Sequence, residues 1–307
     1  YDVIIAGAGI VGLAAGLKIL ESMPATKLLI LEKESGPAMH QTGHNSGVIH
    51  SGIYYKPGSL KARNCIHGYQ LLLDFCRREE VPFEICGKII AATDKSEFAG
   101  LDAIYEKGIA NGLDKIRKID KDELNELEPH ANAIKGIYVP YTGIIDYKVV
   151  AAKFAEKILS LGGEIVYGNR INSVRKNNSA AEVVSGNDSF RTKVFINCCG
   201  LQSDEVAKLS GDPVSTRIIP FRGEYYKIRP EKKYLVKNLI YPVPDPAFPF
   251  LGVHFTRMLS GDVEAGPNAV LAFKKEGYNK TSFSFTDTFR TFSWSGFYKI
   301  AVKYYKT

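Results

Sequence analysis

Residues 3–12 read Val-Ile-Ile-Ala-Gly-Ala-Gly-Ile-Val-Gly, and residues 13–20, rich in Leu and Ala, follow them directly. The apolar, partly β-branched residues before the first glycine predict a short buried strand. The helix formers after it predict a helix that begins inside the glycine motif. A second apolar strand is predicted at residues 28–31, and it ends on Glu32. These features together predict a βαβ unit with an acidic residue at its tip.

The three glycines of this unit have the G-x-G-x-x-G spacing, with Gly7, Gly9 and Gly12 at the fixed positions. Gly7 permits the tight turn out of the strand, Gly9 lets a pyrophosphate approach the backbone, and Gly12 lets the helix pack close to the sheet. The helix N-terminus, at Ile10 and Val11, offers N–H groups and a positive dipole end to the phosphates. A glycine-rich turn in an ordinary α/β domain is the alternative. The complete strand, helix, strand and acidic tip favour dinucleotide binding.

Glu32 narrows the choice of dinucleotide. Its carboxylate can accept hydrogen bonds from both ribose hydroxyls of an adenosine, and it would repel a 2′-phosphate. The sequence therefore favours FAD or NAD over NADP.

Composition places the chain among ordinary globular proteins. It has 307 residues, of which 45% are apolar and 24% charged, so it is long enough for two domains. The net charge of +7 is spread along the chain, which favours a solvated surface over nucleic-acid binding. The five cysteines have no metal-binding spacing, and Cys198 and Cys199 lie in an apolar segment, so we expect buried thiols, no metal and a cytoplasmic location. No apolar run reaches the length of a membrane span, and we expect no cleavable signal before the first strand.

A loop of small and hydrogen-bonding residues extends from Gln41 to Tyr55 without a charged side chain. In a dinucleotide fold, such donors would surround the flavin end of FAD. A polar surface loop is the alternative interpretation.

The order of the predicted elements indicates an interrupted dinucleotide domain. A long helix is predicted at residues 60–78 and a strand pair at 83–93, whereas a buried strand at residues 193–200 returns to the first domain. We predict an α/β fold in which a Rossmann-like FAD-binding domain is interrupted by an α+β substrate domain with a mostly antiparallel sheet. The predicted boundaries are 1–82 and 146–217 for the FAD domain, and 83–145 and 218–307 for the substrate domain.

Several stretches resemble the flavin oxidoreductases of the D-amino-acid oxidase and glycerol-3-phosphate dehydrogenase superfamily, and within it the L-2-hydroxyglutarate oxidases and dehydrogenases. Besides the glycine motif, these stretches are residues 44–62, Pro220-Phe-Arg-Gly-Glu-Tyr-Tyr226, Phe250-Leu-Gly-Val-His-Phe-Thr256 and Gly266-Pro-Asn-Ala-Val-Leu-Ala-Phe273. The resemblance spans almost the whole chain.

The resemblance implies FAD-dependent oxidation of L-2-hydroxyglutarate to 2-oxoglutarate, with oxygen or a quinone as electron acceptor. A quinone acceptor would bring the protein into peripheral contact with the inner membrane. Members of this family continue beyond the position of Thr307, with a segment that closes over the flavin ring, so we expect that segment to be missing here. The cofactor contacts that we predict are Gly7, Gly9, Ile10, Val11, Gly12, Glu32, Lys33, Thr42, His44, Asn45, Ser46, Gly47, Val48, Ile171, Cys199 and Gly200.

Oxidation of a 2-hydroxy acid requires a base for the hydroxyl proton and cations for the carboxylates. Histidine suits the base because its pKa lies near neutrality. His254 is the first choice and His50 the second, and either histidine could instead only hydrogen-bond the flavin. The cation candidates are Arg222, Arg257, Lys61 and Lys274, each of which could instead be a solvated charge. Tyr54 and Tyr225 are candidates for hydroxyl contacts or for core aromatics.

Two other functions stay open at this point. The chain could be a related flavoenzyme that acts on glycerol-3-phosphate or a D-amino acid. It could also be a truncated protein that binds no flavin.

Overall fold

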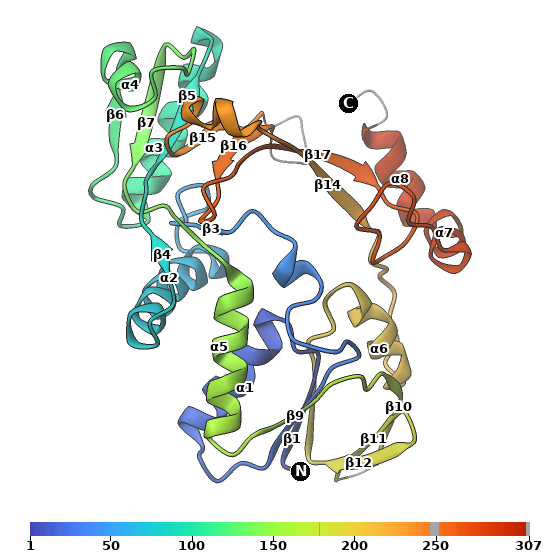
Figure 1. Cartoon of the computed structure of the whole chain (residues 1–307). Helices are drawn as coiled ribbons and strands as arrows, with labels where there is room; N and C mark the ends of the chain where they lie inside the picture. Colours follow the sequence, from blue (N-terminus) through green and yellow to red (C-terminus); the bar gives the residue numbers. More distant parts are fainter. Residues whose placement is uncertain (178, 246–251, 305–307) are drawn as a thin grey trace. The chain divides into compact units, whose positions relative to one another are not determined.

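The computed structural model describes residues 1–177, 179–245 and 252–304, and these residues form two compact units (Figure 1). Unit 1 contains residues 1–45, 147–220 and 271–304. Unit 2 contains residues 46–146 and the described part of 221–270. The chain therefore leaves unit 1 twice and returns to it twice.

Unit 1 is built on a four-stranded sheet in the order β13-β1-β2-β9, in which all neighbours run parallel. The strands are β1 (Val3–Ala6), β2 (Leu28–Leu31), β9 (Glu164–Val166) and β13 (Val194–Asn197). Every residue of β1 and β2 is buried, as expected for apolar strands of a covered parallel sheet. Helix α1 (Ile10–Ser22) connects β1 to β2, and α5 (Tyr147–Ser160) precedes β9.

A glycine lets α1 lie close to this sheet. A Cβ atom on Gly16 would stand 3.1 Å from Ile30 Cδ1 and 3.2 Å from Leu28 Cδ2. Because real Cβ contacts rarely become so short, a larger residue would push the helix outward.

A second, antiparallel sheet of unit 1 contains β10 (Ile171–Lys176), β11 (Ala181–Ser185) and β12 (Asp188–Thr192). Its buried residues Val174 and Val183 share one apolar core with Ile4 and Leu29 of the parallel sheet. The small sheet therefore helps to cover the parallel one.

The rest of unit 1 is helical. It contains η1 (Gln41–Gly43), η3 (Gly200–Gln202), α6 (Ser203–Leu209), α7 (Phe285–Phe292) and α8 (Ser295–Tyr304). The segment that leads to α7 is tied to α6 by an ion pair of 2.5 Å between Lys275 and Asp204, whose side chains are only 5% and 6% exposed. Burial acts to raise the pKa of Asp204, but the hydrogen bonds from Lys275 and the Ile218 amide, with the charges of Lys275 and Lys208, together lower it.

Unit 2 contains a seven-stranded sheet in the order β14-β17-β16-β15-β5-β7-β6. The strands are β5 (Lys88–Ala92), β6 (Arg117–Ile119), β7 (Lys135–Val139), β14 (Phe221–Lys227), β15 (Leu239–Pro242), β16 (His254–Arg257) and β17 (Val263–Leu271). Strands β15 and β5 run parallel, whereas the pairs β17–β16, β16–β15, β5–β7 and β7–β6 are antiparallel.

Helices and a small sheet complete unit 2. These elements are β3 (Val48–Ile49), α2 (Leu60–Arg78), β4 (Phe83–Glu84), η2 (Lys95–Glu97), α3 (Phe98–Ala110), α4 (Lys121–Leu127), β8 (Gly143–Ile145) and η4 (Pro230–Leu235). The main core contains Ile53, Ile90, Leu101 and Ile137. Helix α2 begins where the Ser59 side chain accepts a hydrogen bond from the Ala62 amide, which caps the first turn.

The predicted fold class is confirmed: a parallel dinucleotide-type sheet and a mostly antiparallel sheet lie in separate units. The predicted strand pair at residues 83–93 is wrong, because β4 joins the sheet β3-β8-β4 while β5 joins the large sheet. The break falls at Gly87, where φ is +81° and a Cβ atom would stand 2.9 Å from the Tyr138 hydroxyl.

The two units also differ in extent from the predicted domains. Residues 46–82 group with unit 2, since β3 pairs with β8, and residues 271–304 group with unit 1. The predicted ends of the functional domains, at residues 82, 145 and 217, stay predictions.

Candidate functional site

The turn between β1 and α1 has the geometry that its glycines predict. Gly7 has φ at +101°, and a Cβ atom there would stand 2.6 Å from the Cys198 carbonyl oxygen. A Cβ atom on Gly12 would stand 2.0 Å from the Gly7 carbonyl oxygen. At Gly9 the nearest atom would be Thr42 Oγ1, at 3.4 Å. Two of the glycines are therefore required by the turn itself, whereas Gly9 leaves space beside the backbone.

The first turn of α1 has backbone donors to spare. Gly9 is the N-cap residue and has no side chain to cap the helix. Thr42 Oγ1 accepts a hydrogen bond of 2.9 Å from the Ile10 amide. Within the described part of the chain, the amides of Val11 and Gly12 have no hydrogen-bond acceptor, and Val11 is 66% exposed. A helix N-terminus in this state is suited to an anionic group such as a diphosphate.

Glu32 is held in place at the end of β2. It is 9% exposed, and its carboxylate accepts hydrogen bonds from the Ala8 amide at 2.7 Å and from the Glu34 amide at 2.9 Å. Each oxygen of a carboxylate has a second lone pair, so both can still accept a ribose hydroxyl. Tyr167 lies close enough to Glu32 to be affected by its charge: burial, and then this charge, raise the pKa of Tyr167.

The predicted flavin loop is divided between the units. In unit 1, His44 stacks on Tyr278 with the ring centroids 4.0 Å apart, and Asn45 Nδ2 donates to the Thr42 carbonyl at 2.6 Å. In unit 2, Gly47 has φ at +63°, and a Cβ atom there would stand 2.5 Å from the Ile145 carbonyl oxygen. Ser46 and Val48 flank this glycine, and Val48 pairs with Ile144.

The second crossover of unit 1 brings Cys199, Gly200 and Ile171 into the same unit as the glycine turn. Gly200 has φ at +51°, and the Cys199 amide donates to Asn197 Oδ1 at 3.1 Å. Cys198 and Cys199 are free thiols that are only partly buried, so the expected full burial is wrong for this pair, although their partial burial raises the pKa of Cys199 to about 12. A protonated thiol is a poor nucleophile, so this pair is suited to packing.

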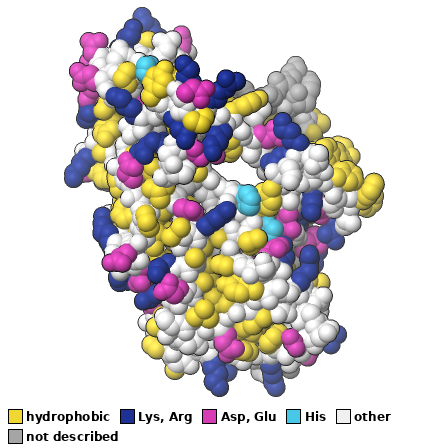
Figure 2. All heavy atoms as spheres, in the orientation of Figure 1, with side chains coloured by type: hydrophobic (Ala, Val, Ile, Leu, Met, Phe, Trp, Pro, Cys, Tyr) yellow, Lys and Arg dark blue, Asp and Glu magenta, His cyan; other side chains and the backbone are white. Residues whose placement is uncertain are grey.

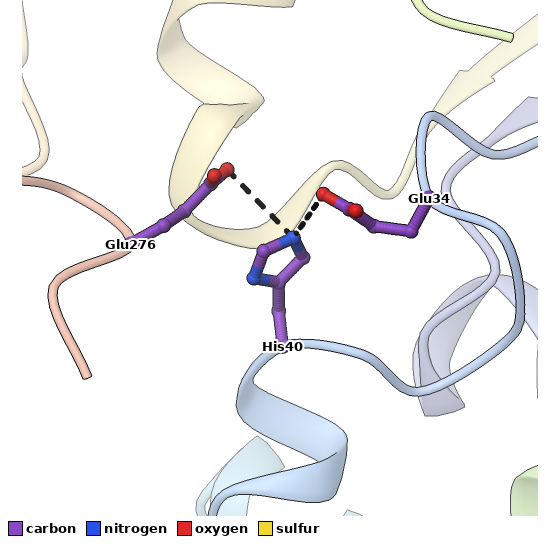
Figure 3. A group of neighbouring side chains, drawn as sticks. All are labelled: Glu34, His40 and Glu276. Carbon is purple, nitrogen blue, oxygen red and sulfur yellow. Dashed lines mark hydrogen bonds and ion pairs between the residues drawn. The ribbon is translucent and has the colours of Figure 1, made fainter. Parts of the chain in front are cut away.

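Next to Glu32 lies a group of charged side chains that the sequence did not predict as a group. Figure 3 shows Glu34, His40 and Glu276 pointing toward one another, and their ligand-type atoms lie within 4.8 Å of each other. Lys33 lies among them: its ammonium pairs with Glu34, lies 3.0 Å from Glu276 Oε1 and 2.7 Å from His40 Nε2. The cation that this group requires is therefore the lysine itself.

The pKa values of the two carboxylates agree with that interpretation. Hydrogen bonds from Lys33 and then from His40 lower the pKa of Glu34. Burial acts to raise the pKa of Glu276, but hydrogen bonds from Gln202 and Lys33 prevail and lower it. We call Lys33, Glu34, His40 and Glu276 the lysine-33 network.

His254, the first candidate base, lies on β16 in unit 2 and is 3% exposed. Its Nδ1 lies 2.9 Å from the Gly252 carbonyl oxygen, and its ring stacks on Tyr241 at 4.0 Å. Because a carbonyl oxygen only accepts, Nδ1 carries the proton and Nε2 keeps its lone pair. Burial lowers the pKa of His254, which keeps the ring neutral at pH 7.

His50, the second candidate, lies on the loop after β3 in unit 2. The residue is exposed, but partial shielding of its ring from water, and then the charges of Lys88 and His254, act to lower its pKa. The two predicted histidines therefore belong to one electrostatic group, in which Lys88 takes part.

The predicted cations do not join this group. Arg222 binds Glu224, with Nη2 2.6 Å from the carboxylate. Arg257 pairs with Glu84 and donates from Nε to the Lys237 carbonyl at 2.9 Å. Lys61 is exposed and lies over the Tyr55 ring at 5.6 Å. Lys274 belongs to unit 1.

Sequence reasoning missed Lys88. It begins β5, is 1% exposed, and places its ammonium over the rings of Tyr54 and Tyr241, at 4.5 and 4.7 Å from their centroids. The available signal was a lysine at the head of the apolar strand Lys-Ile-Ile-Ala-Ala. Tyr225, which the sequence analysis offers for a hydroxyl contact or as a core aromatic, packs its ring against Gly266 of β17. Phe250 and Leu251 of the third motif lie outside the described residues.

The chain matches the family described as FAD dependent oxidoreductase over residues 2–300. It belongs to that family: the protein is an FAD-dependent oxidoreductase and FAD is its cofactor. The family resemblance predicted from the sequence is thus confirmed.

More specific relatives carry one name. L-2-hydroxyglutarate dehydrogenase of Indibacter alkaliphilus is 56% identical over 308 residues, which cover 100% of this chain and 77% of that relative. The Escherichia coli K12 protein of the same name is 43% identical over 98% of this chain and 71% of its own length. The human mitochondrial protein of that name is 43% identical over 98% of this chain and 68% of its own length.

A solved structure extends the comparison to three dimensions. L-alpha-glycerophosphate oxidase from Mycoplasma pneumoniae, with FAD bound, is similar with a TM-score of 0.82 and 26% identity, covering 92% of this chain and 75% of that one. Glycine oxidase from Geobacillus kaustophilus shares the fold with a TM-score of 0.77.

The residues of unit 1 fit this cofactor. The space at Gly9, the spare amides of Val11 and Gly12, and the remaining lone pairs of Glu32 provide the donors and acceptors that a diphosphate and a ribose require.

Proposed function

We propose that this protein oxidises L-2-hydroxyglutarate to 2-oxoglutarate. The observation that carries the proposal is the 56% identity, over the whole of this chain, to a relative named L-2-hydroxyglutarate dehydrogenase. Relatives of that name with 43% identity, from a bacterium and from human mitochondria, add to it.

The reaction removes a proton from the hydroxyl group and a hydride from the carbon that bears it, and bound FAD supplies the hydride acceptor. In our proposal His254 Nε2 accepts the proton. Its neutral state and its fixed tautomer, with Nδ1–H directed at the Gly252 carbonyl, support this role. Tyr241 stacks on the ring and restricts its rotation. His50 is the second candidate for the base.

For the cofactor, we propose that the spare amides of Val11 and Gly12 bind the diphosphate. Ile10, whose amide donates to Thr42 Oγ1, and Thr42 itself stay predicted contacts beside it. Glu32 would accept the ribose hydroxyls. The remaining predicted contacts stay proposals: Gly7, Gly9, Lys33, His44, Asn45, Ser46, Gly47, Val48, Ile171, Cys199 and Gly200. For the carboxylates, Arg222, Arg257 and Lys61 stay predictions, although the first two already bind carboxylates of their own unit.

The electron acceptor is proposed to be oxygen or a quinone. Within the described residues, no helix combines the length and the apolar character that crossing a membrane requires. Apolar side chains gather near α7 and α8 on the face that Figure 2 shows, where Phe285 is 83% and Val302 71% exposed. This surface supports a proposal of peripheral membrane contact. Lys and Arg side chains are spread over that same face. A cytoplasmic location stays a prediction.

Oxidation of glycerol-3-phosphate is the second candidate function, because the FAD-bound glycerophosphate oxidase shares the fold at 26% identity. Anaerobic mixing of the FAD-loaded protein with each substrate separates the two candidates. Under the first proposal, L-2-hydroxyglutarate bleaches the flavin band within seconds, and D-2-hydroxyglutarate and glycerol-3-phosphate do not. Bleaching by glycerol-3-phosphate alone would replace the first proposal with the second.

A further inference from the structure

Lys88 is a buried cation for which the described residues provide no paired anion. Its residue exposure is 1%, and it lies in the middle of the large sheet, paired with Leu239 of β15 and Val139 of β7. Within the described part of unit 2, no carboxylate forms an ion pair with its ammonium. An isolated buried ammonium costs several kcal/mol even after the protein relaxes. A structural lysine would be expected to have a partner.

The ammonium of Lys88 lies over the faces of two aromatic rings. The rings of Tyr54 and Tyr241 lie 4.5 and 4.7 Å from its ammonium. Cation–π contacts contribute about 0.5–2 kcal/mol each, which offsets only part of the cost of burial. The Tyr54 hydroxyl is buried and also has no hydrogen-bond partner among the described residues. Two polar groups at one place are thus left for a ligand.

The titratable neighbours of Lys88 provide no negative charge at pH 7. The charge of Lys88 acts on both His50 and His254, and the thiol of Cys65 is the one acidic group that acts on Lys88. No carboxylate of the described residues acts on any of these three basic groups. An anion that enters here would provide the counter-charge that the ammonium of Lys88 lacks, whereas a neutral ligand would not.

We propose that the ammonium of Lys88, between the rings of Tyr54 and Tyr241, binds one carboxylate of the substrate. This inference rests on the proposed function and adds to it the group that selects a 2-hydroxy acid. Both Lys88 and His254 contact the Tyr241 ring, so one aromatic side chain positions the carboxylate-binding cation and the candidate base. The side chain is a binding residue in this scheme, and no bond forms or breaks on it.

The inference gives binding a pH dependence. Burial lowers the pKa of Lys88 to about 7. The other titratable groups that face it are His50 and His254, with lowered pKa values, and Cys65, Tyr54 and Tyr241, with raised ones. Between pH 7 and 8.5 Lys88 is thus the group of this set that changes charge. The dissociation constant of a carboxylate ligand should be flat below about pH 7 and rise above it, by at most about tenfold per pH unit.

The test uses the FAD-loaded protein and 2-oxoglutarate as the probe, titrated through the change in flavin absorbance at pH 6.5. Lys88→Met keeps the length of the side chain and removes the charge. It should raise the dissociation constant about 30-fold, the loss expected for a hydrogen bond between charged groups. Lys88→Arg should restore most of the affinity. The matched control is Lys135→Met on β7, whose ammonium lies over the Phe98 ring at 4.9 Å, and it should bind as the wild type does.

Wild-type affinity in Lys88→Met with full FAD content would overturn the inference. If that variant does not fold, the wild-type pH profile decides, because a dissociation constant that stays flat from pH 6.5 to 8.5 would also overturn it. The two proposals fail differently. A wild-type protein that L-2-hydroxyglutarate reduces, with a Lys88→Met variant of unchanged affinity, removes the role of Lys88 alone. A wild type that neither compound affects removes both.

Discussion

Lys33 and Lys88 are both withdrawn from solvent, and they differ in what surrounds them. Lys33, in unit 1, lies among Glu34, Glu276 and His40, and its side chain is 20% exposed. Lys88, in unit 2, is 1% exposed and lies between two tyrosine rings, with no carboxylate paired to it in the part of the chain that the structure describes. The first lysine has its counter-ions within the protein, whereas the second has none among the described residues.

We infer from this difference that Lys33 has a structural role, whereas Lys88 has a role in binding a ligand. Paired charges recover part of their desolvation cost within the fold, so the lysine-33 network can join the loop at residues 33–40 to the segment at 276 without any ligand. An unpaired buried charge lowers the stability of the free protein and recovers that cost only when an anion binds. Functional sites are the places where such a cost is tolerated.

The largest effect is expected at His254, the candidate base next to Lys88. His254→Ala should slow flavin reduction by L-2-hydroxyglutarate about 10²–10³-fold, because the base for the hydroxyl proton is removed. FAD content should not change. Stopped-flow reduction under anaerobic conditions measures this, with His67→Ala, an exposed histidine of α2, as the control. If Glu276→Gln, in the lysine-33 network, slows reduction as much as His254→Ala does, the assignment of a purely structural role to that network is wrong.

Next in size is the effect of Glu32 on the cofactor. Glu32→Ala should weaken FAD binding about 10- to 100-fold, because it removes a charged acceptor for the ribose hydroxyls. The fold should survive, although the buried Ala8 amide loses its acceptor. Flavin fluorescence during titration of the apoprotein gives the dissociation constant. Unchanged affinity would remove Glu32 from the ribose role, and Glu21→Ala on the exposed side of α1 serves as the control.

Much of unit 1 could be predicted from the sequence because its signals are local. The glycine spacing, the apolar runs and Glu32 lie within one βαβ unit, and each has one physical function there. The catalytic candidates His50 and His254 were also named, because histidine in a motif is conspicuous. Lys88 and Glu276 were not, since their meaning depends on residues far along the chain, such as Tyr241 for the first and Lys33 for the second. Arg222 and Arg257 show another limit of the sequence, which cannot reveal that Glu224 and Glu84 already bind them, and their predicted role stays a prediction.

Stability should respond with opposite signs at the two lysines. Lys33→Met leaves Glu34 and Glu276 without their cation, and it should lower the free energy of unfolding of the FAD-free protein by about 2 kcal/mol. Lys88→Met removes an unpaired buried charge, and it should raise the free energy of unfolding at pH 7 by about 1 kcal/mol. Urea unfolding followed by circular dichroism measures both. A loss of stability at Lys88 equal to that at Lys33 would mean that both lysines are structural.

The smallest effect is the dependence of stability on pH, and it isolates Lys88 most directly. Its pKa is about 7 in the folded protein, against 10.5 for the free side chain, so between these values the unfolded chain binds the proton and the folded chain does not. The free energy of unfolding of the ligand-free protein should therefore rise from pH 7 to 8.5, by at most about 1.4 kcal/mol per pH unit from this group. Below pH 7 both states are protonated and this contribution is constant. Lys88→Met should lack the rise, and Lys33→Met should keep it, because the carboxylates of the lysine-33 network have lowered pKa values and titrate only in acid. Equal slopes in the wild type and in Lys88→Met would show that the ammonium is charged at pH 8.5 in the folded protein, and an anion inside the protein would then have to be sought.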